Sequence, residues 1–138
     1  MKYLLNNVFS FIVTGFVYVV GGIDISLKCL LIVMVIDYIS GVASAIYNKK
    51  VNSKIGFKGI LKKLVYILAI GLAVRVDTLT GNSGIIRSIV IYFFVANDGI
   101  SIIENMGEMG IKLPKKLTDV LEQLKNKGDD KKWYLMII

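Results

Sequence analysis

The residues best suited to chemistry in this chain are ionisable side chains that interrupt long apolar runs. Asp37 lies near the middle of the run 26–47, and Asp98 lies in the second half of the run 84–103. An unpaired ionised side chain near the centre of a bilayer costs about 2.5–3.5 kcal/mol. Such residues therefore mark internal ion pairs, a water-filled path or a contact between subunits. The intramembrane polar set is Asp37, Arg75, Asp77, Arg87, Asp98 and Glu104.

The depths of these residues within their runs predict partners. Asp37 is about ten residues from the inner end of its run, and Arg75 is about 11 residues from the inner end of the run 64–80. We therefore expect an Asp37–Arg75 pair. Depth also groups Asp77 with Arg87, and Asp98 with Lys62 and Lys63. Two interpretations stay open: the charges lock a bundle internally, or they line an aqueous path or a subunit interface.

No constellation of catalytic residues accompanies these charges. The chain has 138 residues, no His and a single Cys. One cysteine cannot form an internal disulfide or a metal cage. No nucleophile lies beside a base, and no glycine-rich loop joins a strand to a helix. We expect no enzyme, no cofactor and no metal ion, and we expect Cys29 to be a buried, inert thiol.

Four apolar runs must position the charged residues. Hydrophobic residues make up 55% of the chain, and a helix of about 20 apolar residues crosses the hydrocarbon core of a bilayer. Lipid requires backbone groups to be satisfied internally, which a helix achieves within one segment. The sequence predicts an all-α membrane protein with a four-helix transmembrane domain over residues 1–105. Its predicted spans are 3–23, 26–47, 64–80 and 84–103.

The lysines predict the orientation of these helices. The net charge is +7, and the lysines cluster between the second and third runs and after the fourth, whereas the other two turns lack them. Lysine-rich short loops stay in the cytoplasm, so both termini should be cytoplasmic. Lysines placed between apolar runs favour an anionic inner leaflet as partner over nucleic acid. The membrane-surface basic residues are Lys49, Lys50, Lys54, Lys58, Lys62, Lys63, Lys115 and Lys116.

The tail, residues 106–138, predicts a basic amphipathic helix. Pro114 suits the first turn of a helix, and Leu113, Leu117, Val120, Leu121 and Leu124 share one face after it. This helix either lies on the membrane surface with its lysines toward anionic lipid, or packs as a solvated helix on the inner face of the bundle. The role of the apolar end from Trp133 to Ile138 stays open.

Small residues in the second run predict close helix packing. Two small residues spaced four apart on one helix let a second helix approach closely, either within one bundle or between subunits. The residues with this spacing are Ser40 with Ser44, and Gly41 with Ala45.

Several stretches, taken in order, make the chain similar to a known family. They are Asp37-Tyr38-Ile39-Ser40-Gly41 with Ala45, then the segment 52–63, Arg75-Val76-Asp77, Ile100-Ser101-Ile102-Ile103-Glu104-Asn105, and Gly110-Ile111-Lys112-Leu113-Pro114-Lys115-Lys116-Leu117. Over about residues 30–125 the chain resembles the toxin-secretion/phage-lysis holin family. Its apolar end departs from the charged tails of that family.

The resemblance implies a small multi-pass protein of phage or prophage origin in the bacterial inner membrane. Such proteins form homo-oligomers and open lesions, through which an endolysin or a toxin passes without necessarily touching them. Two other classes stay open. One is a small proton-coupled four-helix transporter that uses Asp37 as its coupling carboxylate. The other is a membrane assembly subunit without conductance.

Overall fold

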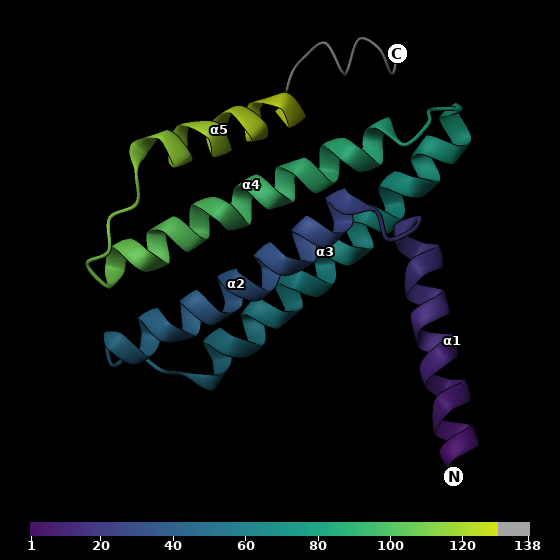
Figure 1. Cartoon of the computed structure of the whole chain (residues 1–138), viewed down its shortest axis with the longest axis horizontal. Coiled ribbons are helices and arrows are strands. Elements are labelled where there is room, and N and C mark those ends of the chain that lie inside the picture. The colour runs from purple at the N-terminus through teal and green to yellow at the C-terminus, as the bar shows by residue number, and fades with distance from the viewer. Residues whose placement is uncertain (130–138) are drawn as a thin grey trace.

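The computed structural model describes residues 1–129, with side chains up to residue 126, and every regular element in this part is a helix (Figure 1). The helices are α1 (Lys2–Val20), α2 (Ile25–Tyr47), α3 (Ser53–Thr80), α4 (Ile85–Glu108) and α5 (Lys115–Asp129). Three of them, α1, α2 and α4, are long and apolar enough to cross a membrane. The all-helical prediction is confirmed, while a fourth crossing, by α3, stays a prediction, as does the position of both termini.

Helices α2, α3 and α4 lie side by side (Figure 1). α2 and α4 lie against each other and run in the same direction, and α3, which connects them in the chain, runs in the opposite direction. The core of the bundle contains Leu27 and Leu30 of α2, Ile70 of α3 and Ile91 of α4, all fully buried. Because α2 and α4 are parallel neighbours, residues at matching positions along them lie at the same level.

α1 diverges from this bundle (Figure 1). α1 ends at Val20 and is capped by Gly21, with φ 78°, and Gly22 follows with φ 106°. Both angles lie in the left-handed region that glycine occupies most readily, which allows the sharp change of direction. Only the last residue of α1, Val20, is buried, and its apolar side chains from Tyr3 to Ile12 are largely exposed. In a membrane, such side chains meet lipid.

The start of α3 differs from the prediction. The apolar run suggested a helix from Leu64, but α3 begins at Ser53. The side chain of Asn52 accepts a hydrogen bond from the backbone N–H of Lys54 at 3.0 Å and caps the helix. Lysine is a good helix former, so the basic segment continues the apolar one without a break. α4 likewise extends beyond the predicted end, to Glu108.

α5 folds back along α4 in the opposite direction (Figure 1). Leu121 lies so close to Gly99 that a Cβ atom at Gly99 would be 2.8 Å from its side chain. Lys125 Nζ lies 5.8 Å from the centroid of the Phe93 ring. The helix therefore packs on the flank of α4, while Leu117 and Val120 stay exposed. The apolar end, Trp133 to Ile138, lies outside the described residues.

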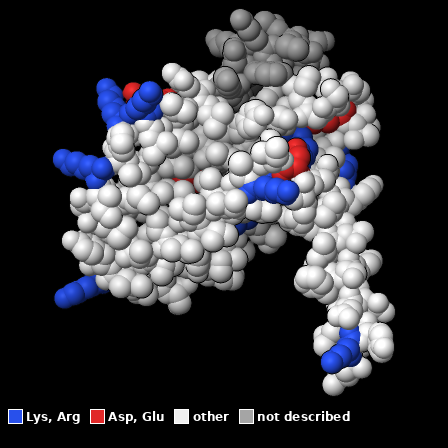
Figure 2. All heavy atoms as spheres, in the orientation of Figure 1, with Lys and Arg blue, Asp and Glu red and all other residues white. Residues whose placement is uncertain are grey.

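The face of the bundle seen in Figure 2 is largely uncharged. Lysines project at the end where α2 meets α3 and α4 meets α5 (Figure 2). Cys29 is exposed, so its predicted burial is wrong. The buried residues of α2 at Leu27 and Leu30 define the face toward α4, and Cys29, two residues after Leu27, points away from it.

Candidate functional site

Two parallel helices carry matching polar stripes. In each, an aspartate is followed by polar residues three and seven positions later, a spacing that keeps all three on one helix face. The stripes lie on neighbouring helices that run in the same direction, so equivalent residues lie at similar levels. They consist of Asp37, Ser40 and Ser44 on α2, and of Asp98, Ser101 and Asn105 on α4.

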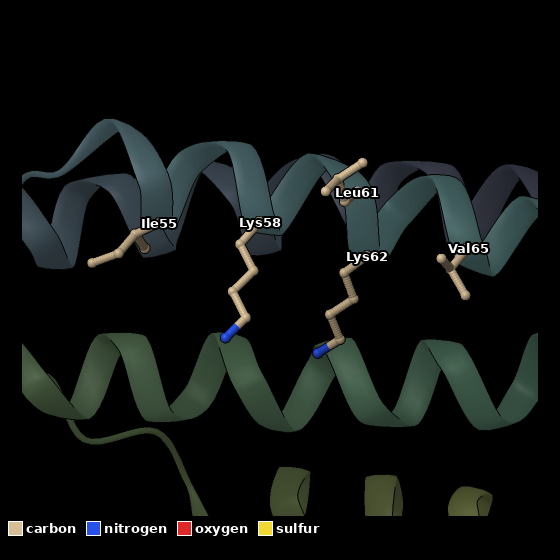
Figure 3. Close-up of a pocket in the computed structure, with 6 residues that line it drawn as sticks. Ile55, Lys58, Leu61, Lys62 and Val65 are labelled. Carbon is tan, nitrogen blue, oxygen red and sulfur yellow. The ribbon is translucent and has the colours of Figure 1, made fainter.

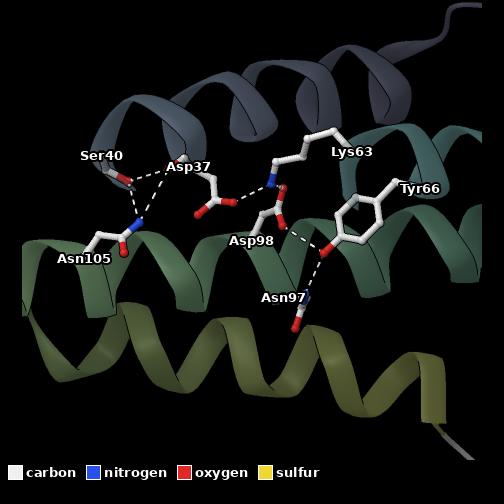
Figure 4. Close-up of polar contacts among 7 residues, drawn as sticks. All are labelled: Asp37, Ser40, Lys63, Tyr66, Asn97, Asp98 and Asn105. Carbon is white, nitrogen blue, oxygen red and sulfur yellow. Dashed lines mark hydrogen bonds and ion pairs between the residues drawn. The ribbon is translucent and has the colours of Figure 1, made fainter. Parts of the chain in front are cut away.

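Lys63 of α3 joins the two aspartates (Figure 4). Its ammonium group donates to Asp98 Oδ2 at 2.6 Å and also to Asp37 Oδ2. The side chain of Asp98 is fully buried, and those of Asp37 and Lys63 are 11% and 14% exposed. One positive charge thus serves two carboxylates, and the three residues together carry one net negative charge.

Tyr66 and Asn97 complete the coordination of Asp98. The Tyr66 hydroxyl donates to Asp98 Oδ1 at 3.0 Å, and Asn97 Nδ2 donates to the Tyr66 oxygen at 2.6 Å (Figure 4). The Tyr66 ring stacks on Phe94 with 3.9 Å between ring centroids. Asp98 is therefore held by a cation and a hydroxyl on the side facing α3, which offsets part of the cost of its burial.

The polar stripes continue toward the lysine-rich end. Asn105 Nδ2 donates to Ser40 Oγ at 3.0 Å, and Ser44 Oγ donates to Glu108 at 2.6 Å. Here α2, α3 and α4 border a cleft of about 1060 Å³, whose lining includes Asp37 and Ser101. In the described part of the chain every buried side-chain nitrogen or oxygen has a hydrogen-bond partner. The closed bundle thus satisfies its own polar interior.

The predicted Asp37–Arg75 pair is wrong. Arg75 donates instead to the carbonyl of Tyr18 at 3.3 Å, and its guanidinium carbon lies 4.7 Å from the Tyr18 ring centroid. Depth on the third helix was counted from Leu64, whereas α3 begins at Ser53. Counted from that start, Lys63 is ten residues deep, which matches the ten residues between Asp37 and the end of α2 at Tyr47.

Arg87 lies at the opposite end of the bundle, where it fastens the turn between α1 and α2. Its Nη1 donates to Asp24 at 2.8 Å, its Nε to the carbonyl of Val20 at 2.6 Å, and its Nη2 to that of Gly22 at 2.8 Å. Asp24 also caps α2 by accepting from the Leu27 N–H at 3.0 Å. The hydrogen bond from Arg87 holds the pKa of the Asp24 carboxyl below its usual range.

Asp77 meets the backbone of Arg87 and not its side chain. Its two carboxylate oxygens accept from the N–H groups of Ile86 and Arg87, both at 2.9 Å. A carboxylate at this position satisfies unpaired donors and complements the helix dipole of α4. The predicted Asp77–Arg87 charge pair is therefore wrong: the two residues meet through a backbone hydrogen bond, and the ion-pair partner of Arg87 is Asp24.

The structure places the remaining candidates as follows. Gly41 packs near Asn105, and Ala45 borders the cleft beside Ser44. Glu104 is exposed on α4. Lys63 belongs to the interior network and not, as predicted, to the membrane-surface set. The other members of that set are exposed: Lys49, Lys50, Lys54, Lys58, Lys62, Lys115 and Lys116.

Sequence reasoning missed the uncharged members of the network. Tyr66, Asn97 and Asn105 lie in apolar or nearly apolar helices, where polar side chains need a partner as charges do. The sequence spacing could have identified Asn105. It lies seven residues after Asp98, just as Ser44 lies seven residues after Asp37.

Comparison with known proteins gives a consistent result. The model of the bacteriophage holin family matches residues 14–126. A probable holin of Bacillus phage phi105 is 31% identical over 105 residues, which cover 76% of this chain and 78% of the phage protein. An uncharacterised 14.9 kDa protein of Clostridium perfringens is 35% identical, with coverage of 89% and 99%. No solved structure matches the chain.

Proposed function

The chain belongs to the bacteriophage holin family, a family of non-enzymatic membrane proteins, and from that membership we propose that it is a lesion-forming holin. It oligomerises in the bacterial cytoplasmic membrane and opens a path through it. An endolysin or a toxin then leaves the cytoplasm, without necessarily binding the holin, and the cell lyses.

The observation that carries this proposal is the enclosed polar network of α2, α3 and α4. Its stripes face each other within one bundle, where Lys63 pairs with Asp37 and Asp98. The same donors and acceptors are able to re-pair between subunits, or with water, when the helices separate. A polar surface whose partners are exchangeable in this way is what we propose the switch from a closed bundle to an open ring uses.

The proposed orientation places the lysine-rich end of the bundle at the cytoplasmic face. Apolar lengths support crossings by α1, α2 and α4. A crossing by α3 is proposed because α3 lies antiparallel to both α2 and α4 and returns the chain to the outer turn. Both termini then lie in the cytoplasm, and the Arg87–Asp24 pair lies at the outer face.

The direct test is inducible expression in a bacterium together with a cytoplasmic muralytic enzyme. Membrane potential and release of a second cytoplasmic enzyme are followed in the same culture. We expect growth to continue for a delay and then collapse abruptly, with both signals changing together. A muralytic enzyme inactivated at its active site is the matched control: the potential should collapse without lysis.

The same experiment separates the alternatives. If cells grow with an intact potential while the protein is abundant in the membrane, the holin function is wrong. A proton-coupled transporter would instead give saturable, substrate-dependent flux that depends on Asp37, although Lys63 pairs with that carboxylate in the structure. An assembly subunit without conductance would change neither signal.

A further inference from the structure

A third polar stripe lies on α1, outside the interior network. Ser10 and Thr14 follow Asn7 at three and seven positions, the same spacing as in the stripes of α2 and α4. This spacing keeps the three residues on one face of the helix, and Asn6 lies beside them. Because α1 is long and apolar enough to cross a membrane, these four side chains interrupt a surface that is otherwise suited to lipid.

The stripe of α1 has no partner in the described part of the chain. All four residues are exposed, and no hydrogen bond there involves their side chains. A long side chain such as that of Lys58 extends well away from its helix (Figure 3) and is able to reach water from within a membrane. Asparagine, serine and threonine lack this reach, and a polar group without a hydrogen bond is costly in hydrocarbon. The stripe therefore requires a partner inside the membrane.

The bundle of the same chain does not supply this partner. Val20 belongs to the core and Phe16 packs against it, so these two residues define the face of α1 toward the bundle. At about 100° per residue, the stripe around Ser10 lies about a third of a turn away from that face. The stripes of α2 and α4, in addition, already satisfy each other. The partner must therefore come from another molecule.

We propose that the stripe of α1 pairs with the same stripe on a second copy of this chain. All copies enter the membrane in one orientation, so their α1 helices are parallel, as α2 and α4 are within the bundle. Asparagine both donates and accepts, which makes the stripe complementary to itself across a two-fold axis. The inference rests on the proposed oligomerisation and deepens it by naming the contact.

The residues around the stripe support a parallel pair. Tyr3 precedes Asn7 by four positions, and Val17 follows Thr14 by three. The series from Tyr3 to Val17 thus advances in alternating steps of four and three, which is the seam of a two-stranded coiled coil. A polar asparagine at such a seam fixes the register of the two helices.

Disulfide cross-linking of the full-length chain in bacterial membranes tests which face of α1 pairs. Cys29→Ser removes the native thiol from every variant. Tyr3→Cys places a thiol on the seam, and the matched control Leu5→Cys places one at nearly the same depth but about 160° around the helix. Both native residues are exposed. Because a disulfide requires Cα atoms within about 7 Å, we expect dimers with Tyr3→Cys and less than about a tenth as many with Leu5→Cys.

The amides are tested in the Tyr3→Cys chain, labelled with donor and acceptor dyes and diluted with lipid in proteoliposomes. An interhelical hydrogen bond in a membrane contributes about threefold in affinity, so Asn6→Leu with Asn7→Leu should weaken the dimer about tenfold. Asn6→Gln with Asn7→Gln retains the amides and should retain most of the affinity. Retention in this variant excludes misfolding as the cause of the loss.

Three outcomes overturn the proposal: equal cross-linking at positions 3 and 5, a dimer that the leucine substitutions leave unchanged, or a chain that stays monomeric. Failure of the lesion-forming function has a different result, in which the dimer forms while the membrane potential stays intact. Cells that lyse although Tyr3→Cys gives no dimer would refute the contact through α1 and leave the lesion-forming function standing.

Discussion

At the scale of residues, Lys63 brings one positive charge to two carboxylates that belong to different helices. Removing one member of a buried ion pair leaves the other uncompensated, which typically costs about 3–5 kcal/mol. The three residues are not equivalent in this respect. Loss of Asp37 leaves a simple pair of Lys63 with Asp98, whereas loss of Lys63 leaves two buried acids without a cation.

We therefore expect Lys63→Met to destabilise the bundle by about 3–5 kcal/mol and Asp37→Asn to destabilise it by clearly less. Unfolding in mixed detergent micelles, followed by circular dichroism, measures the difference. Lys62→Met is the control, because this neighbouring lysine makes none of the interior bonds, and its stability should stay close to that of the unchanged chain. Equal effects of Lys63→Met and Asp37→Asn would contradict the bridging role of Lys63.

The sequence allowed the acids to be identified but not their partner. Asp37 and Asp98 stand out because an ionised group is costly in an apolar run. The choice of Arg75 over Lys63 as the partner of Asp37 depended on where the third helix starts. Apolar composition shows where a hydrophobic stretch begins, but the helix itself begins earlier. Asn52, a good N-cap residue twelve positions before Leu64, carried the missing information.

At the scale of elements, α5 is fixed to α4 through a position without a side chain. A Cβ atom at Gly99 would lie 2.8 and 2.9 Å from the two methyl carbons of Leu121. Overpacking of this kind costs about 1–3 kcal/mol. The contact lies well along α4, and the missing side chain at Gly99 lets α5 pack closely there.

We expect Gly99→Val to loosen α5, with amide hydrogen exchange in α5 about tenfold faster or more and exchange in α2 unchanged. Gly107→Val is the control, because it places the same side chain in α4 with no atom within 4 Å of the added Cβ. Adding Leu121→Ala to Gly99→Val should restore slow exchange. Unchanged protection of α5 in Gly99→Val would show that Leu121 moves aside at no cost.

Amphipathic spacing predicted the existence of α5, but not which surface its apolar face covers. Both interpretations of the tail placed it at the inner end of the bundle. In the structure the segment between α4 and α5 reverses the chain, and Gly99 and Leu121 make close packing possible. The sequence does not show which segment packs against a glycine within a long apolar helix.

At the scale of the whole molecule, α3 decides how many times the chain crosses the membrane. We expect reporter fusions after Asn48, Asn82 and Gly128 to be inside, outside and inside, because lysine-rich segments stay in the cytoplasm. The reporters after Asn48 and Asn82 form the critical pair, since they flank α3. Reporters on the same side at Asn48 and Asn82 would show that α3 does not cross.

Hydrophobic length was enough to predict an all-helical membrane protein, since a run of about 20 apolar residues has few other structures open to it. It was not enough to predict that α1 diverges from the bundle. An apolar helix is covered by lipid as favourably as by a neighbouring helix. The sequence of α1 therefore contains no requirement for close packing.

The contacts of Arg87 also constrain how this protein is able to vary through evolution. Two of its acceptors, at Val20 and Gly22, are backbone carbonyls, which every amino acid supplies. The third is the carboxylate of Asp24, whose negative charge only an acidic side chain replaces. Substitutions at position 20 therefore keep the acceptor, whatever they do to packing. Replacement of Arg87 or Asp24, in contrast, should occur together in a lineage or not at all.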